Sequence, residues 1–115
     1  MTFSSVTMMA NLTRDVNLHY TQSQVAMAKI GVAINNRRKK GDEWIEEPCY
    51  VDVLMIGKRA EAFAKFHKKG STAIFRDAKL AYEEWEAKDG SNRNRVYVLA
   101  HDWVFPPKPR SETPF

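Results

Sequence analysis

The sequence predicts an all-β fold, a five-stranded barrel with one helix between the third and fourth strands. Three observations lead to this prediction. Several long segments alternate apolar and polar residues, which is the period of a half-buried strand. Only one segment, residues 59–67, has apolar residues at helical spacing. Glycine, proline, asparagine and aspartate lie between these segments, as expected for turns.

The first two strands are predicted over residues 6–12 and 26–34. Their apolar positions fall on every second residue, so one face of each strand is expected to be buried. These positions are Val6, Met8, Ala10, Leu12, Ala26, Ala28, Ile30, Val32 and Ile34. Residues 35–48 combine turn formers with many charges, and we predict an exposed, mobile hairpin loop there.

The third strand and the helix follow one another directly. Residues 49–56 alternate, and the face expected to fill the barrel carries Val51, Val53 and Met55. The opposite face carries Tyr50, Asp52, Leu54 and Ile56. After Gly57 a helix is predicted, because apolar residues recur at helical spacing and would close one end of the barrel. These residues are Ala60, Phe63, Ala64 and His67.

The fourth strand is predicted over residues 72–86 and the fifth over residues 95–105. They are joined at Asp89-Gly90, a strong hairpin signal. Pro106 and Pro107 end regular pairing, because proline donates no backbone hydrogen bond. We therefore expect one domain over residues 1–105 and a short extended tail over 106–115. Five strands with a helix in this position form the OB fold, which commonly binds oligonucleotides on its strand face and in its loops.

Composition restricts the class of protein. A chain of 115 residues suits a single domain, and 18 Lys and Arg against 14 Asp and Glu give a net charge of +4 and a pI near 9.3. This balance favours an anionic partner. The single Cys49 excludes an internal disulfide and is expected to be a reduced, buried thiol. With no apolar run of membrane-spanning length and no secretion signal, we expect a soluble, cytoplasmic protein without a membrane partner.

An enzyme is the main alternative class, and the sequence contains no motif for one. His19, His67 and His101 lie in different elements without the spacing of a metal site. Neither a phosphate-binding glycine loop nor a nucleophile elbow is present. We expect no enzymatic activity and no cofactor. A second alternative, an OB-fold module that binds a protein or a structured RNA, remains open.

Three blocks of the sequence, taken in order, resemble the bacterial single-stranded DNA-binding protein family. They are Val6 to Asp15 followed by Tyr20, then Gly57-Lys58, Ala60-Glu61 and Lys69-Gly70-Ser71, then Ala81 to Gly90 with its Trp85. The resemblance covers roughly residues 3–105. It implies an OB-fold protein, associated with the nucleoid, that binds and protects single-stranded DNA in replication, recombination or repair. It also implies a homotetramer, with a dimer left open.

Single strands are held by aromatic faces, on which bases stack, and by cations that follow the phosphates. The resemblance implies stacking by Trp85 and Tyr50, and it adds Ile56, where family members commonly carry an aromatic residue. A packing role near a strand end is the alternative for Trp85. Trp44 lies beside a basic run in the predicted loop and is a further candidate. Trp103 and Phe105 are expected to be structural, near the end of the last strand or at a subunit contact.

The candidate phosphate contacts are basic residues in the strands, in the predicted loop and near the hairpin after Trp85. They are Lys29, Arg37, Arg38, Lys39, Lys40, Lys79, Arg93 and Arg95. A solvated charge run is the alternative for residues 37–40, and simple exposure is the alternative for Arg93 and Arg95.

The sequence also departs from the family pattern. One additional residue near Asp77-Ala78 predicts a bulge that redirects the strand leading to Trp85. Asp52 places a carboxylate, which repels phosphate, on the expected binding face. Pro114-Phe115 matches the end of the acidic peptide with which family members recruit replication and repair enzymes. A partner-docking tip and a coincidental match both remain open.

Overall fold

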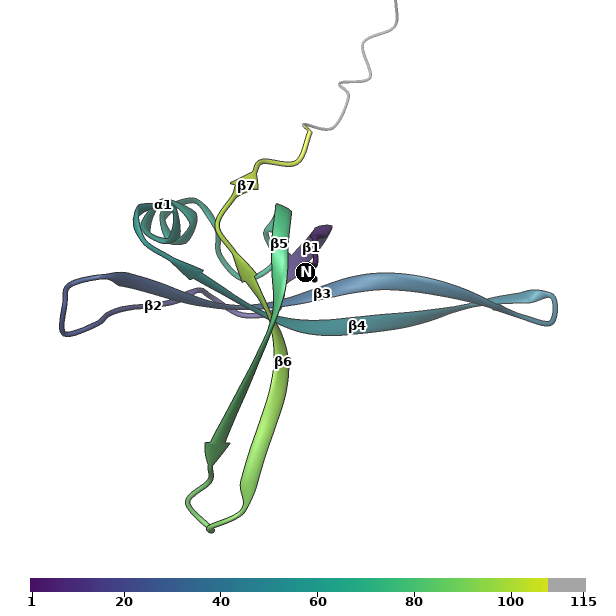
Figure 1. The fold of residues 1–115 in the computed structure, drawn as a ribbon. Coiled ribbons are helices and arrows are strands. Elements are labelled where there is room, and N and C mark those ends of the chain that lie inside the picture. The colour runs from purple at the N-terminus through teal and green to yellow at the C-terminus, as the bar shows by residue number, and fades with distance from the viewer. Residues whose placement is uncertain (108–115) are drawn as a thin grey trace, which may run out of the picture.

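The computed structural model describes residues 1–107 and confirms the closed five-stranded barrel with its helix (Figure 1). The elements follow in chain order as β1 (Val6–Leu12), β2 (Asn17–Tyr20), β3 (Ala26–Lys40), β4 (Glu43–Ile56), α1 (Lys58–Phe66), β5 (Thr72–Glu86), β6 (Asn92–Ala100) and β7 (Trp103–Val104). The predicted division at residue 105 stays a prediction, because residues 108–115 lie outside the described part of the chain.

The barrel closes because β1 pairs with two strands. The sheet runs in the order β1-β3-β4-β6-β5, and β1 also pairs with β5. β4 and β6 are parallel, paired only from Val53↔Val98 to Met55↔Ala100, and the other pairs are antiparallel. Beyond these three positions β4 and β6 separate. The ribbon of β3 and β4 and the hairpin of β5 and β6 then leave the barrel as two arms (Figure 1).

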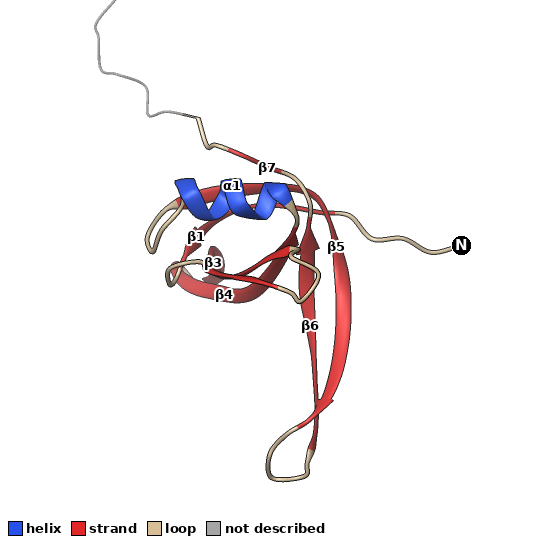
Figure 2. Cartoon of the chain, turned by 90° about the vertical axis from the view of Figure 1, so that its left-hand side faces the viewer, coloured by secondary structure: helices blue, strands red, loops and turns tan. Residues whose placement is uncertain are grey.

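The barrel interior contains the residues that the alternation predicted. Ile30, Val32, Met55 and Phe75 are fully buried in one apolar core. The helix α1 lies across one end of the barrel (Figure 2) and adds the fully buried side chain of Phe63. It begins after Gly57, whose φ of +95° is a conformation that glycine adopts without steric cost.

The prediction of a loop over residues 35–48 is wrong. β3 continues to Lys40 and β4 begins at Glu43, so only Gly41 and Asp42 form the turn between them. The register is continuous from Met27↔Ile56 to Lys40↔Glu43. Backbone hydrogen bonds hold such a ribbon whatever the polarity of its side chains, so charge density did not reveal it. Cys49 lies in this arm, where neither face is covered by the core, and its thiol is exposed rather than buried.

The predicted fourth strand and its bulge are confirmed. β5 spans Thr72–Glu86, and its pairing with β1 shifts between Met8↔Phe75 and Val6↔Ala78. Between these two pairs β1 advances by two residues, from Met8 to Val6, while β5 advances by three, from Phe75 to Ala78. Asp77 is at the shift with a φ of +51°, a backbone conformation unusual for a residue other than glycine. The extra residue turns Lys79 and every second residue after it toward the outside of the barrel.

The predicted fifth strand is two strands in the structure. β6 begins earlier than predicted, at Asn92, and ends at Ala100, while β7 (Trp103–Val104) pairs with β5 at Ile74↔Val104 and Phe75↔Trp103. Both β6 and β7 pair with β5 in one register, as Lys79↔Leu99 and Phe75↔Trp103 show, and the pairing is interrupted at His101 and Asp102, beside the bulge of β5 at Asp77. The short strand β2, which pairs with β3, was not predicted as a separate element.

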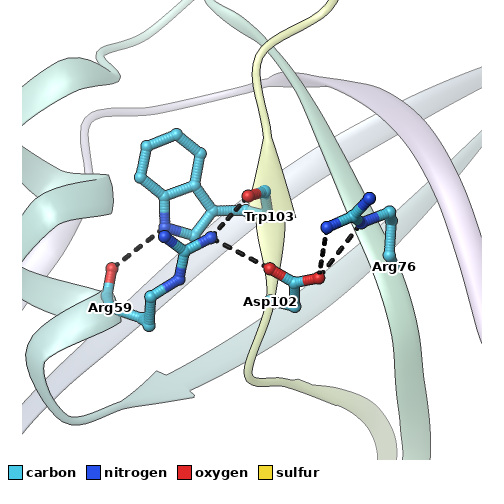
Figure 3. Close-up of polar contacts among 4 residues, drawn as sticks. All are labelled: Arg59, Arg76, Asp102 and Trp103. Atoms are coloured by element: carbon cyan, nitrogen blue, oxygen red, sulfur yellow. Dashed lines mark hydrogen bonds and ion pairs between the residues drawn. The ribbon is translucent and has the colours of Figure 1, made fainter.

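Asp102 lies at this interruption and forms ion pairs with Arg59 of α1 and Arg76 of β5. Its Oδ1 accepts a hydrogen bond from Arg59 Nη2 (3.0 Å), and its Oδ2 accepts two from Arg76, from Nη2 (2.8 Å) and Nε (3.0 Å) (Figure 3). Arg59 Nη2 also donates to the carbonyl of Trp103 at 2.5 Å. The hydrogen bonds from Arg76 hold the pKa of Asp102 below its ordinary value, despite the opposing effect of desolvation. Arg76 is thus engaged with Asp102, away from the candidate DNA contacts.

Trp103 and Phe105 pack over α1, as predicted for structural residues. Trp103 is 5% exposed, and its ring meets Phe63 edge-on at 5.7 Å and His67 at 5.0 Å. Phe105 stacks on His67 at 5.7 Å. These aromatic contacts fasten β7 to the helix.

Candidate nucleic-acid interface

The outer face of β3, β4, β6 and β5 brings together most of the predicted contact residues. Strand register places one row across the four strands, because Lys29 faces Leu54, Leu54 faces Leu99 and Leu99 faces Lys79. In this row the two lysines, both exposed, flank an apolar pair. Ile56 continues the same face of β4 toward the helix and is 44% exposed.

The ribbon arm extends this face outward. Tyr50 is 73% exposed and Trp44 is 66% exposed, and both lie on the same face of β4 as Asp52, because they are separated by even numbers of residues. The register places Arg37 opposite Glu46 and Lys39 opposite Trp44. Arg37 and Lys39 therefore share this face with the two aromatic side chains.

Arg38 and Lys40 lie on the opposite face of the ribbon. Arg38 faces Ile45 and Lys40 faces Glu43 in the register, one step away from the aromatic row. Arg38 Nε also forms an ion pair with Glu47 Oε1 at 2.7 Å. The basic run of residues 37–40 is thus divided between two faces, which its sequence order alone does not show.

The hairpin arm carries the second aromatic group. Trp85 is 45% exposed and faces Arg93 across the hairpin, so it is a surface residue and not part of the core. Arg95 faces Glu83 on the same side, and its guanidinium carbon lies 5.9 Å from the ring of Trp85 and 5.6 Å from that of Tyr97. Half-exposed rings with cations beside them suit stacking bases and their phosphates.

Sequence reasoning missed three residues of this face: Arg14, Glu83 and Tyr97. Arg14 follows β1 and reaches Asp52, with 3.4 Å between Nη2 and Oδ1. Glu83 lies two residues before Trp85 on β5, and Tyr97 lies two residues after Arg95 on β6. Alternation within each strand places Glu83 on the face of Trp85 and Tyr97 on the face of Arg95, wherever the bulge lies, because the bulge at Asp77 precedes both Glu83 and Trp85.

A groove of about 580 Å³ opens where β4 and β6 separate. Its lining includes Tyr50, Met9, Ile34, Leu80, Val96 and Tyr97. Met9, Leu80 and Val96 are each more than half exposed, which makes this an apolar surface next to the aromatic residues of the outer face.

Other predicted residues lie elsewhere. Pro114 and Phe115 are outside the described residues. Within residues 1–107 no group of His, Cys, Asp and Glu is arranged to hold a metal ion, and no helix is long and apolar enough to cross a membrane. His67 is 6% exposed, and its Nδ1 donates a hydrogen bond to the Phe63 carbonyl at 3.0 Å. Its buried Nε2 has no partner within this range, and burial lowers the pKa of His67.

Comparison with known proteins gives a consistent result. The model of the Single-strand binding protein family matches residues 3–106. Among curated proteins, the chain is 38% identical over 97 residues to a single-stranded DNA-binding protein of Borreliella burgdorferi, a match that covers 84% of this chain and 64% of that protein. It is 40% identical over 99 residues to one of Wolinella succinogenes, covering 85% of this chain and 60% of that protein.

The chain thus spans about three fifths of the length of these curated relatives. Among solved structures, a deletion mutant of the single-stranded DNA binding protein from Thermus aquaticus matches with a TM-score of 0.76 at 23% identity. The match covers 89% of this chain and 49% of that one. At this identity the match concerns the fold, which agrees with the barrel described above.

Proposed function

This chain belongs to the Single-strand binding protein family, and from that premise we propose that it binds single-stranded DNA without sequence preference. Bases stack on Trp85, Tyr50 and Trp44, with Ile56 as an apolar contact. Phosphates pair with the cations of the same face. Because every base has an aromatic face and every nucleotide a phosphate, this mode of binding is tolerant of sequence.

The observation that carries this proposal is the single face shared by the aromatic and basic side chains. Tyr50 and Trp85 come from different strands, and both are exposed on the outer face, Tyr50 by 73% and Trp85 by 45%. Cations face two of the aromatic residues in the strand register, Lys39 opposite Trp44 on the ribbon and Arg93 opposite Trp85 on the hairpin. Each stacked base contributes about 1–3 kcal/mol, as judged from alanine substitution.

The role that follows from this activity is non-catalytic protection of exposed single strands during replication, recombination or repair. The same premise supports a cytoplasmic location in association with the nucleoid.

We also infer that the protein acts as a homo-oligomer, a tetramer or a dimer. Two features support a second copy as the partner. One edge of β1 over Val6–Ala10 has no strand partner among residues 1–107, since β3 pairs only with Asn11 and Leu12. The exposed side chains of Met9, Leu80, Tyr82 and Val96 form an apolar surface nearby. Unpaired edges and apolar patches of this kind favour association.

The test is a fluorescence titration with poly(dT), duplex DNA and a structured RNA at two salt concentrations. We expect poly(dT) to quench tryptophan fluorescence strongly and duplex DNA to bind far more weakly. The logarithm of the affinity should fall with the logarithm of the salt concentration by about 0.7 per neutralised phosphate. Equal affinity for single strand and duplex would contradict the proposal, and preferential binding of the RNA would favour an OB-fold module of a different kind.

A further inference from the structure

Four charged side chains form a continuous series of ion pairs across the outer face. Asp52 Oδ1 lies 3.4 Å from Arg14 Nη2, and Asp52 Oδ2 lies 2.9 Å from Arg95 Nη1. Arg95 Nε in turn donates to Glu83 Oε1. The four residues come from the segment after β1 and from β4, β6 and β5, so the series crosses the centre of the candidate interface.

The backbone leaves room for this arrangement. Gly31 of β3 faces Asp52 of β4 in the strand register. A Cβ at position 31 would lie 2.6 Å from Arg14 Nη1. Arg14 therefore lies directly over β3, in space that a side chain at residue 31 would need. At the other end, the guanidinium of Arg95 is near the rings of Trp85 and Tyr97. Both arginines therefore lie on the outer face that carries the candidate contact residues.

The charges of this series cancel. Arg14 and Arg95 contribute two positive charges, and Asp52 and Glu83 contribute two negative ones. A guanidinium binds phosphate best through two parallel N–H donors, and Arg95 already directs Nη1 and Nε at carboxylates. The phosphate must therefore displace a carboxylate or share the guanidinium with it.

The ion pairs are also weak enough to exchange. The four side chains are 37% to 58% exposed, and ion pairs this exposed to solvent contribute little to stability. A phosphate that replaces the carboxylate at an arginine leaves that carboxylate nearby as a repelling charge. The net effect of Asp52 and Glu83 on phosphate binding is then unfavourable.

We propose that Asp52 and Glu83 mask Arg14 and Arg95, and so lower the affinity of this face for single-stranded DNA and reduce the salt dependence of binding. This inference rests on the proposed function. On this proposal, Asp52 and Glu83 help to set how readily the DNA strand dissociates. Arg14 becomes a further phosphate contact once phosphate displaces Asp52 from it.

The test uses Asp52→Asn, Glu83→Gln and the double variant in the full chain, titrated with poly(dT) over a range of salt concentrations. Each amide keeps the shape of its carboxylate, which favours retention of the fold. For each single variant the matched control is Glu61→Gln on α1, which removes one exposed carboxylate and so makes the same change in net charge away from the interface. The control separates a local effect from the overall charge.

Each arginine released should steepen the salt dependence by about 0.7 in the log–log slope. For the double variant, the affinity ratio between about 50 mM and 200 mM salt should then grow by about sevenfold over the wild type. Affinity at the lower salt concentration should rise, and Glu61→Gln should resemble the wild type.

The outcomes distinguish this inference from the proposed function. If the wild type does not bind poly(dT), the proposed function is wrong. If the wild type binds and each single variant has the same affinity and slope as Glu61→Gln, the masking inference alone is wrong. A loss of affinity in the double variant would also overturn it, because the carboxylates would then be positioning the arginines for phosphate.

Discussion

Trp85 is the residue on which the stacking hypothesis depends most directly. Its ring is half exposed on the hairpin arm and makes no contribution to the buried core. We expect Trp85→Ala to weaken binding of single-stranded DNA by about 1–3 kcal/mol, or roughly 5- to 150-fold, while the slope of affinity against salt stays unchanged. Fluorescence anisotropy with a labelled oligonucleotide measures both quantities.

Phe66→Ala is the matched control for Trp85→Ala. Phe66 is 55% exposed beside Trp103 and Phe105, on the helix side of the molecule. Its removal should leave DNA affinity unaltered. If Trp85→Ala lowers the melting temperature strongly but leaves affinity intact, Trp85 is a packing residue and the assignment fails.

Protonation of His67, which lies at the C-terminal end of α1, is expected to make the stability of the protein depend on pH. Its ring stacks on Phe63 at 3.9 Å, and burial lowers its pKa in the folded protein, against a smaller opposing effect of the hydrogen bond to the Phe63 carbonyl. Between the lowered folded pKa and the ordinary value of about 6.5, the unfolded chain binds more protons. Stability should therefore be complete above that ordinary value and decline as the pH falls below it.

Melting temperatures measured between about pH 7.5 and pH 5 check this expectation, since that range includes the ordinary histidine pKa. His67→Phe keeps an aromatic ring against Phe63 and removes the titrating group, so the decline over this range should become shallower. His101→Gln, which removes an exposed histidine, should leave the decline as it is in the wild type. Identical pH profiles for wild type and His67→Phe would show that His67 is not the group responsible.

At the scale of elements, the ribbon arm allows a comparison of two double variants that each remove one arginine and one lysine, from opposite faces of the ribbon. Arg37 and Lys39 share a face with Trp44 and Tyr50, whereas Arg38 and Lys40 face the other way. We expect Arg37→Ser with Lys39→Ser to lower the log–log salt slope by up to about 1.4, because two phosphate contacts are lost. Arg38→Ser with Lys40→Ser removes the same charge and should change the slope much less.

Titration of both double variants with poly(dT) decides between a directed contact and a solvated charge run. Equal reductions in slope would mean that the ribbon acts only through its total charge, and the assignment of one binding face would then be wrong.

The whole molecule is expected to associate through the apolar surface formed by β1 and the hairpin arm. Leu80→Glu with Val96→Glu places charge on this surface, and light scattering should then detect a smaller species than the wild type forms. Affinity for long poly(dT) should fall because linked sites are lost, while affinity for an oligonucleotide of about 10 nucleotides, within reach of one barrel, should be unchanged.

Val25→Glu is the control for this change. Val25 is 39% exposed in the turn before β3, away from the apolar surface, and the charge should not alter the size of the assembly there. A wild-type protein that is already monomeric at the concentrations used for DNA binding would contradict the inferred oligomer.

Some features of the fold follow from the sequence because they are local. The alternation in residues 6–12 and 49–56 identified which side chains enter the barrel, since the side-chain period of a strand does not depend on its partner. The helix, predicted over residues 59–67 and found at Lys58–Phe66, and the turn at Asp89-Gly90 were likewise predicted from short-range spacing and turn chemistry. The extra residue near Asp77 was noticed only against the pattern of the family that the sequence resembles, and the bulge was predicted from it.

Other features depended on the partners of each strand, which no local pattern reports. Residues 35–48 were predicted as a loop because of their charges, but backbone hydrogen bonds hold them as a two-stranded ribbon. The last strand is interrupted at Asp102, which accepts hydrogen bonds from Arg59 and Arg76.

From the sequence alone follow the barrel, its helix, and the two faces of residues 49–56, one filling the barrel and the other carrying Tyr50 and Asp52. The paired strands were needed to show that Arg37 and Lys39, and not Arg38 and Lys40, lie with the aromatic rings, and that Asp52 pairs with both Arg14 and Arg95. The physical reason is register: a shift of one residue between paired strands moves every side chain to the other face, and ion pairs between distant strands exist only once that register is set.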